Sequence, residues 1–309
     1  MKKNQTENIE GVFLEIDDLI KYSFIARNIH LRKNSKVNSV MAGRHASKLR
    51  GRGMDFEESR AYVKGDDIRN IDWKVTAKLQ KTYTKVFQEE KEHPAVIATD
   101  LTKSMFFGSK KNMKSVCASQ ITALMAYKLS GDGDRVGGIV YSDDSVDMFK
   151  PKRDKKSMLH FLEKVVQVNN GLMNVGSEKS IDSVRTDVFE HLHNLVSHDF
   201  TVVVISDFKR YNPKVIQSLL DISVHNDVIV FKIYDELEKN IPEERIALSD
   251  GDGHIEINGK DKKTVEAIRK DFEKKQKEFI DELNAYKIPV FLINTEIAIE
   301  EQILEQLGL

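Results

Sequence analysis

The hydrophobic pattern of the chain changes near Pro94. Before it, apolar residues recur every three or four positions over 14–32, which predicts a helix with one apolar face. After it, short apolar runs typical of strands buried on both faces alternate with stretches of helical period. Strands are predicted over 95–99, 135–141, 145–149, 201–205, 227–233, 245–248, 254–257 and 288–293. Helices are predicted over 111–129, 155–166, 187–196, 213–222, 262–286 and 297–307.

This alternation predicts an α/β fold, a doubly wound and mostly parallel sheet with helices on both faces, preceded by an N-terminal helical and irregular segment. We expect two domains: residues 1–90, which pack on the main domain, and the α/β domain of residues 91–309. The basic and polar stretch 36–52 is interpreted as a solvated loop, and a phosphate-binding arm is the alternative.

Composition narrows the functional classes. The 48 Lys and Arg residues nearly balance 49 Asp and Glu residues, which argues against a globally basic nucleic-acid binder. A single cysteine, Cys117, excludes an intramolecular disulfide and a zinc site built on several thiolates. No apolar run approaches the roughly 20 residues that span a bilayer, and no signal peptide is evident at the start, so we expect a cytoplasmic protein without membrane insertion.

Acidic residues follow two of the predicted strands. Asp100 comes directly after the first strand and is followed at alternate positions by Thr102 and Ser104, while Asp207 follows the strand over 201–205. In an open α/β sheet, ligands bind beyond the carboxyl ends of the strands. An all-oxygen set of this kind suits a hard divalent cation such as Mg²⁺. The alternative is that Asp100 or Ser104 simply caps the next helix.

Two motifs carry a resemblance to known families. The segment 100–104 resembles the D-x-S-x-S signature of the metal-ion-dependent adhesion site in von Willebrand factor A domains. An upstream block, together with 133–137 and 205–207, resembles the bacterial family known as domain of unknown function 58, in which such a block precedes an A-like domain. The resemblance covers roughly 51–208. The residues of the upstream block are 53–57, Arg60, Ala61, Tyr62, Gly65, Asp66, Arg69, Ile71, Asp72 and Trp73.

The resemblance implies a metal site made by three loops. Asp100, Thr102 and Ser104 match the first loop, and Asp207 matches the third. The second loop should supply a threonine just before a helix, and Thr186 is the candidate. The implied ion is Mg²⁺, with Mn²⁺ or Ca²⁺ as alternatives.

The charged residues of the upstream block are interpreted as a structural latch. Arg60, Asp66, Arg69 and Asp72 would form ion pairs that hold the segment against the sheet, with Trp73 as an apolar anchor. We favour this interpretation over a catalytic role.

Three functions follow from these observations. The resemblance implies a non-enzymatic, divalent-metal-dependent protein-interaction module, an adaptor that links a MoxR-type AAA+ ATPase to a client during assembly or maturation of a complex. The alternative is a haloacid-dehalogenase-like phosphotransferase with Asp100 as nucleophile, although Thr102 stands where those phosphatases have their general acid. The third is a structural component whose metal site has lapsed, with Thr102 and Lys103 as the departures.

Overall fold

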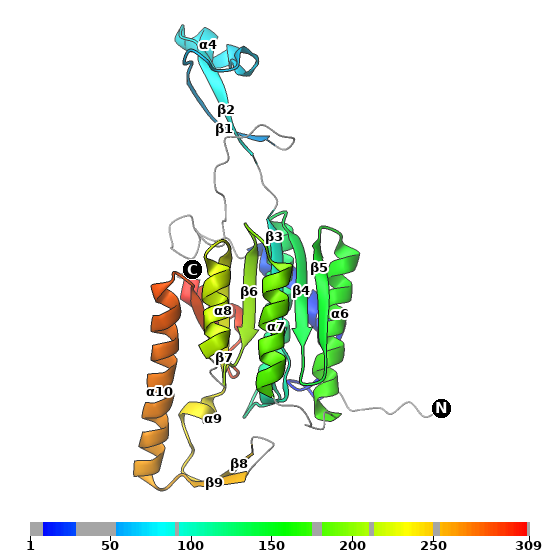
Figure 1. Ribbon diagram of the computed structural model, residues 1–309, viewed down its shortest axis with the longest axis vertical. Coiled ribbons are helices and arrows are strands. Elements are labelled where there is room, and N and C mark those ends of the chain that lie inside the picture. Colours follow the sequence, from blue (N-terminus) through cyan, green and yellow to red (C-terminus); the bar gives the residue numbers. More distant parts are fainter. Residues whose placement is uncertain are drawn as a thin grey trace, which may run out of the picture. The chain divides into compact units, whose positions relative to one another are not determined.

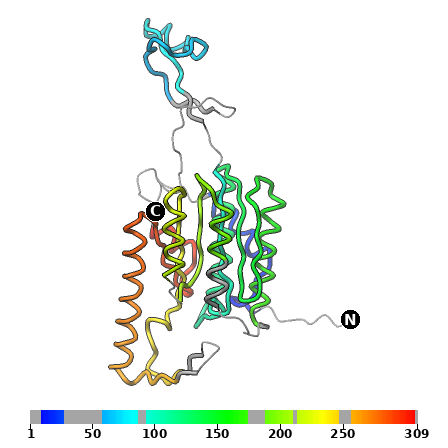
Figure 2. The backbone as a smooth tube through the Cα atoms, in the orientation of Figure 1, coloured from blue at the N-terminus to red at the C-terminus, as the bar shows by residue number. Residues whose placement is uncertain are grey.

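The computed structural model describes residues 9–28, 54–89, 93–174, 181–209, 213–249 and 254–307. The chain divides into two compact units. The first, which we call the α/β unit, consists of Met1–Met41 and His93–Leu309, and the second, the hairpin unit, of Ala42–Glu92. Figure 2 traces the backbone of each unit, with the other residues in grey. The basic stretch 36–52 lies outside the described residues.

A six-stranded sheet forms the middle of the α/β unit, in the order β10-β7-β6-β3-β4-β5. Its strand pairs are parallel except β4–β5, which is antiparallel. The predicted α/β fold with a mostly parallel sheet is therefore confirmed. The strands are β3 (Pro94–Asp100), β4 (Arg135–Tyr141), β5 (Val146–Lys152), β6 (Thr201–Ser206), β7 (Asp227–Tyr234) and β10 (Val290–Asn294).

The order in which the chain adds strands to the sheet reverses beside β3. From β3 the chain adds β4 and β5 on one side, and it then returns to add β6, β7 and β10 on the other side. The carboxyl ends of β3 and β6 therefore lie next to each other at a topological switch point, where open α/β sheets bind their ligands. Both strands are almost entirely buried, because the sheet is covered on two faces.

Helices cover both faces of the sheet. One apolar cluster includes residues of α5 and α6 and alternate residues of the central strands, and the other cluster includes α7, α8 and the remaining strand positions. Figure 1 shows α7 and α8 lying across the near face. The helices are α5 (Lys114–Gly131), α6 (Lys155–Gly171), α7 (Ile181–Leu195), α8 (Pro213–Ser223), α9 (Glu236–Lys239), α10 (Lys262–Ala285) and α11 (Ile299–Leu307), with short 3-10 turns η2 (Lys103–Met105) and η3 (Leu172–Asn174).

The N-terminal helical segment belongs to the α/β unit. Instead of one helix over 14–32, the structure has α1 (Ile16–Ile20) and α2 (Tyr22–Asn28), separated at Lys21, and residues 29–32 lie outside the described part. Leu19 and Tyr22 are buried in the same apolar cluster as α5. The predicted boundary at residue 90 grouped this segment with the residues of the hairpin unit, but its apolar face packs on α5 and thereby joins it to the sheet.

The C-terminal part contains the predicted hairpin and long helix. β8 (Arg245–Ser249) pairs antiparallel with β9 (His254–Asn258). The following α10 lies at the β10 end of the sheet and buries Phe279 and Leu283, while most of its other side chains are exposed (Figures 1 and 2). Within the described residues, no helix is both long enough and apolar enough to cross a bilayer.

The hairpin unit is built on two antiparallel strands that the sequence analysis did not predict. β1 (Met54–Ala61) pairs with β2 (Tyr83–Glu89), with an irregularity in register between Phe56 and Glu58. The chain between the strands forms a 3-10 turn, η1 (Ile68–Asn70), and a short helix, α4 (Trp73–Leu79). Gly65 has a φ of +113°, a conformation that favours glycine.

Candidate functional site

The two acidic strand ends meet at the switch point of the sheet. β3 and β6 pair in register from Ala95 and Thr201 to Thr99 and Ile205, so Asp100 and Ser206 end their strands side by side. Asp100 is completely buried, and Asp207 is almost completely buried. The topology therefore brings these two carboxyl groups together at the carboxyl ends of the strands, which we call the carboxyl edge of the sheet, as the sequence predicts.

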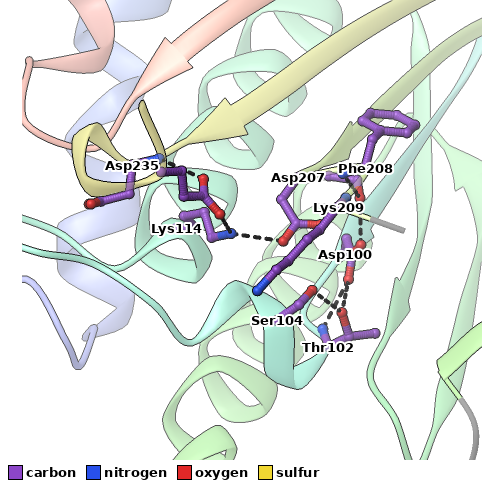
Figure 3. Close-up of polar contacts among 10 residues, drawn as sticks. Asp100, Thr102, Ser104, Lys114, Asp207, Phe208, Lys209 and Asp235 are labelled. Atoms are coloured by element: carbon purple, nitrogen blue, oxygen red, sulfur yellow. Dashed lines mark hydrogen bonds and ion pairs between the residues drawn. The ribbon is translucent and has the colours of Figure 1, made fainter. Parts of the chain in front are cut away.

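The carboxylate of Asp100 is held by three donors (Figure 3). Its Oδ1 accepts hydrogen bonds from the Thr102 amide at 3.0 Å and the Thr102 hydroxyl at 2.6 Å. Its Oδ2 accepts a hydrogen bond from the Ser206 hydroxyl at 2.5 Å. Ser206 was not predicted as a site residue, although its position beside Asp207 at the end of a buried strand was a usable signal.

The first loop gathers its oxygen atoms as the alternation of residues predicts. Thr102 Oγ1 lies 3.3 Å from Ser104 Oγ. Because the Thr102 hydroxyl already donates to Asp100, Ser104 is the donor of this second bond. The loop is fixed from the other side by Asp143, whose Oδ2 accepts a hydrogen bond from the Lys103 amide at 2.6 Å. Asp100, Thr102 and Ser104 therefore lie together.

Asp207 is paired with a lysine that sequence reasoning missed. The Lys114 ammonium group lies 2.8 Å from Asp207 Oδ2 and 3.1 Å from Glu238 Oε1, and the whole Lys114 side chain is buried. The other oxygen, Oδ1, accepts a hydrogen bond from the Lys209 amide at 3.0 Å. Burial alone would lower the pKa of Lys114, but the two carboxylates outweigh burial and raise it, so the amine stays charged.

A third acid follows β7 in the same way. Asp235 is fully buried, and it accepts hydrogen bonds from the Ser109 amide at 2.9 Å, the Thr295 hydroxyl at 2.6 Å and the Leu237 amide at 3.0 Å. Burial alone would raise the pKa of Asp235, but these hydrogen bonds outweigh burial and hold it below its ordinary value. Asp235 thus ties the loops after three strands together, and its place after a buried strand was a signal that the sequence analysis did not use.

Thr186 does not precede its helix. Helix α7 begins at Ile181, so Thr186 lies within the helix and not in a loop before it. The predicted helix start at 187 was too late by six residues, although Ile181 and Val184 extend the apolar spacing of Val188 toward the amino end. The side chain of Thr186 lies outside the described residues.

The predicted five-oxygen set does not fit a resident divalent cation as a whole. The oxygens of Asp100, Thr102 and Ser104 are close enough to share one small ion, but both oxygens of Asp207 already have donors, one of which is the buried ammonium of Lys114. A divalent ion bound to Asp207 would lie beside that like charge. Within the described residues, no group of three or more His, Cys, Asp or Glu side chains is arranged to hold a metal ion.

Two of the predicted latch residues form a direct ion pair inside the hairpin unit. Arg60 binds Asp66 with both ends of its guanidinium group, at 2.9 and 2.7 Å. Asp66 also accepts a hydrogen bond from the Val63 amide at 2.9 Å. The Arg60 guanidinium and this amide hold the pKa of Asp66 below its ordinary value. The pair closes the turn after β1.

The other predicted latch residues make local contacts within the hairpin unit. Asp72 caps α4 by accepting from the Val75 amide at 3.1 Å, and it also accepts from the Ser59 hydroxyl at 2.8 Å. Arg69 lies 3.4 Å from Asp67 at the surface. Trp73 occupies the first turn of α4, and 70% of its surface is exposed.

Comparison with known proteins places the chain in a wider group. Residues 58–280 match the family model described as "Protein of unknown function DUF58". Uncharacterized proteins of Mycobacterium bovis and Mycobacterium tuberculosis are 23% identical over 230 residues, which cover 74% of this chain and 70% of each relative.

Two solved structures are similar at low scores. A conserved hypothetical protein, BatB, from Bacteroides thetaiotaomicron has a TM-score of 0.40 and 14% identity, covering 70% of this chain and 98% of that one. An aerotolerance-related membrane protein from Bacteroides fragilis has a TM-score of 0.38 and 14% identity, covering 70% and 96%.

Proposed function

The chain belongs to the family described as protein of unknown function DUF58, and we propose that it is a non-enzymatic protein-interaction module that uses the carboxyl edge of its sheet. The observation that carries this proposal is the state of Asp100. Three donors from Thr102 and Ser206 occupy its two oxygens inside a fully buried site. A carboxylate whose two oxygens already accept hydrogen bonds inside the protein stabilises the local structure and is poorly placed to attack a substrate.

The alternative phosphotransferase lacks support at the same point. A nucleophilic Asp100 needs a nearby acid to protonate the leaving group. The position two residues later holds Thr102, whose hydroxyl donates to Asp100 itself. The geometry therefore favours binding over chemistry at this edge.

The accessible part of the edge suits an acidic side chain of a partner. Ser104 is partly exposed, and Lys209, which directly follows the Asp207 strand end, is exposed. Figure 3 shows the Lys209 side chain reaching toward Ser104. The exposed ammonium group of Lys209 at this strand end can donate to an incoming carboxylate. We therefore propose an acidic segment as the contact that a partner makes here.

The resemblance in the sequence supplies the kind of partner. It implies a MoxR-type AAA+ ATPase and a client protein, so that the chain would act as an adaptor in the assembly or maturation of a complex. The same resemblance implies that such a contact depends on a divalent cation. The Asp207–Lys114 ion pair disagrees with that requirement, and we propose the contact without it.

A binding measurement with one charge reversal tests the proposal. The purified protein is titrated with the MoxR-type ATPase of the same cell, with and without ATP, by isothermal titration calorimetry. Lys209→Glu should weaken binding about tenfold or more, since like charges at a contact repel. Lys152→Glu is the matched control, because Lys152 is exposed and pairs with Val136 near the start of β4, at the amino ends of the parallel strands.

Two results would contradict the proposal. Equal binding by the wild type and Lys209→Glu would remove the carboxyl edge from the contact. Turnover of p-nitrophenyl phosphate by the wild type, abolished in Asp100→Asn, would favour the phosphotransferase.

A further inference from the structure

A buried lysine at the start of a helix is an unusual placement. Lys114 is the first residue of α5 and is completely buried. Both facts disfavour a cation there: burial strips its water, and the amino end of a helix already carries partial positive charge. Only negative groups nearby can offset these two effects, so the acids around Lys114 indicate why the residue is tolerated.

Two carboxylates from different elements provide that compensation. Asp207, after β6, lies 2.8 Å from Lys114 Nζ, and Glu238, in α9, lies 3.1 Å from it. Glu238 also accepts a hydrogen bond at 3.0 Å from the amide of Asp235, the acid that follows β7. The ammonium group thus links the ends of two neighbouring strands to the start of α5, and Figure 3 shows the strand ends converging on it.

The backbone holds Lys114 in place. Its amide donates to the carbonyl of Phe107 at 2.8 Å, and the preceding amide, of Met113, donates to the carbonyl of Gly11 at 2.8 Å. Its ammonium also lies 5.6 Å from the centre of the Phe107 ring. The cation is therefore built into the edge by the N-terminal segment and by the loop after β3, and it is not a side chain that swings in from solvent.

We propose that the Lys114 ammonium is the permanent cation of this strand edge and takes the charge-balancing role that the sequence predicts for a divalent ion. Asp207 is neutralised from within the fold, and the hydroxyls of Thr102 and Ser206 hold Asp100. The edge is therefore formed and ready to bind without a metal. This inference concerns how the edge is held together and does not depend on which partner it binds.

Removing the ammonium should turn the edge into a metal-responsive site. In Lys114→Met, which keeps most of the side-chain volume, Asp207 and Glu238 lose the ammonium group that lies within 3.1 Å of both, and Lys232 is the cation that still interacts with them. A divalent ion can then bind between them. We expect the Tm of this variant to rise with Mn²⁺ or Mg²⁺ and to fall again with EDTA, whereas the Tm of the wild type responds to neither.

The matched control is another lysine that pairs with a glutamate at the surface. Lys110 lies 3.0 Å from Glu296 and is largely exposed. Lys110→Met should leave the Tm insensitive to divalent ions, as in the wild type. The double variant Lys114→Met/Asp207→Asn should lose most of the metal response of Lys114→Met, because one of the two acids is gone.

Direct metal titration of the wild type decides the matter even where Lys114→Met does not fold. Calorimetry or Mn²⁺ electron paramagnetic resonance should show no saturable metal site at Asp207 in the wild type, so Asp207→Asn should give the same result as the wild type. A wild-type Mn²⁺ site lost in both Asp100→Asn and Asp207→Asn would overturn the proposal. A folded Lys114→Met whose Tm ignores divalent ions would also overturn it. Neither result bears on whether the ATPase binds, so the two proposals fail separately.

Discussion

The two units of the molecule each contain an ion pair of nearly the same length in very different surroundings. In the α/β unit, Lys114 lies 2.8 Å from Asp207, with 0% and 1% of the two side chains exposed. In the hairpin unit, Arg60 lies 2.7 Å from Asp66, with 43% and 19% exposed. Distance does not distinguish the pairs, but burial does. A buried charge has no water to replace a lost partner, and an exposed one does.

The surroundings of the two ion pairs also differ. In the α/β unit the buried Lys114, at the start of α5, binds acids that follow two different strands, so several elements position this ion pair. The hairpin unit leaves Ile68, Trp73 and Leu79 exposed and uses its acids to cap short local turns. Lys114 and Asp235 of the first unit join segments that are distant in the sequence, whereas Asp66 of the second unit closes a local turn.

The largest effect is expected from removing the buried cation. Lys114→Met should lower the free energy of unfolding by about 3–5 kcal/mol, because it leaves two carboxylates near each other in a buried site. Urea denaturation followed by circular dichroism at pH 7 without divalent ions measures this. Lys114→Met/Asp207→Asn should recover part of the loss. A loss below about 1 kcal/mol would mean that burial does not separate the two pairs as we argue.

A packing substitution should follow in size. In β4, a Cβ at Gly138 would lie 2.4 Å from Phe161 Cζ and 2.7 Å from the carbonyl oxygen of Ile97, so Gly138→Ala should cost about 1–3 kcal/mol. Phe161→Leu in the same chain should recover part of this by making room. At Gly65 in the hairpin unit a Cβ would meet nothing within 4 Å. Gly65→Ala should therefore cost only the strain of its φ, roughly 1 kcal/mol, which no packing change rescues.

The stability of the α/β unit should depend on pH through a second lysine, Lys232. Lys232 in β7 has its ammonium 4.3 Å from the centre of the Phe279 ring. Burial, helped by the charge of Lys114 and opposed by Asp207 and Glu238, lowers the pKa of Lys232 to about 8, from an ordinary value of 10.5. Between these two values the unfolded chain binds more protons than the folded one, so the free energy of unfolding should rise with pH.

The matched variant is Lys232→Met. Its free energy of unfolding should lack that rise between pH 8 and 10.5, while the wild type shows it. Urea denaturation at four pH values in this interval measures the difference. Parallel curves for the two proteins would show that Lys232 keeps an ordinary pKa in the folded state.

The smallest effect is expected at the exposed pair. Arg60→Gln should change the global free energy of unfolding very little, because solvent screens both charges. The change should instead appear locally, as faster hydrogen exchange of the Val63 amide, which donates to Asp66. A global loss as large as that of Lys114→Met would erase the contrast between the units.

The buried strands and the first loop of the candidate site could be predicted from the local pattern of apolar and polar residues. The runs 95–99 and 201–205 predicted strands buried on both faces, and the alternation of Asp100, Thr102 and Ser104 predicted that their oxygens gather. Both predictions succeed because side-chain direction along a strand and its following turn is a local property. The strands of the hairpin unit were missed, because its irregular register and polar content hide the period of two.

The partners of the site residues could not be read in this way. Lys114 and Asp207 are 93 positions apart, and the sequence around either residue does not indicate that the two side chains pair. Trp73 was predicted as an apolar anchor against the sheet from its large aromatic side chain, and in the structure 70% of its surface is exposed.

The sequence by itself determined the order of the strands and main helices after Pro94, the burial of the central strands and the acids that end them, because hydrophobic period and strand length are local properties of neighbouring residues. Only the tertiary structure decided what those acids bind. The winding of the sheet about β3 and the docking of α5 bring an ammonium group to Asp207. Charge pairing across such distances depends on where whole elements pack, and that is a property of the assembled core.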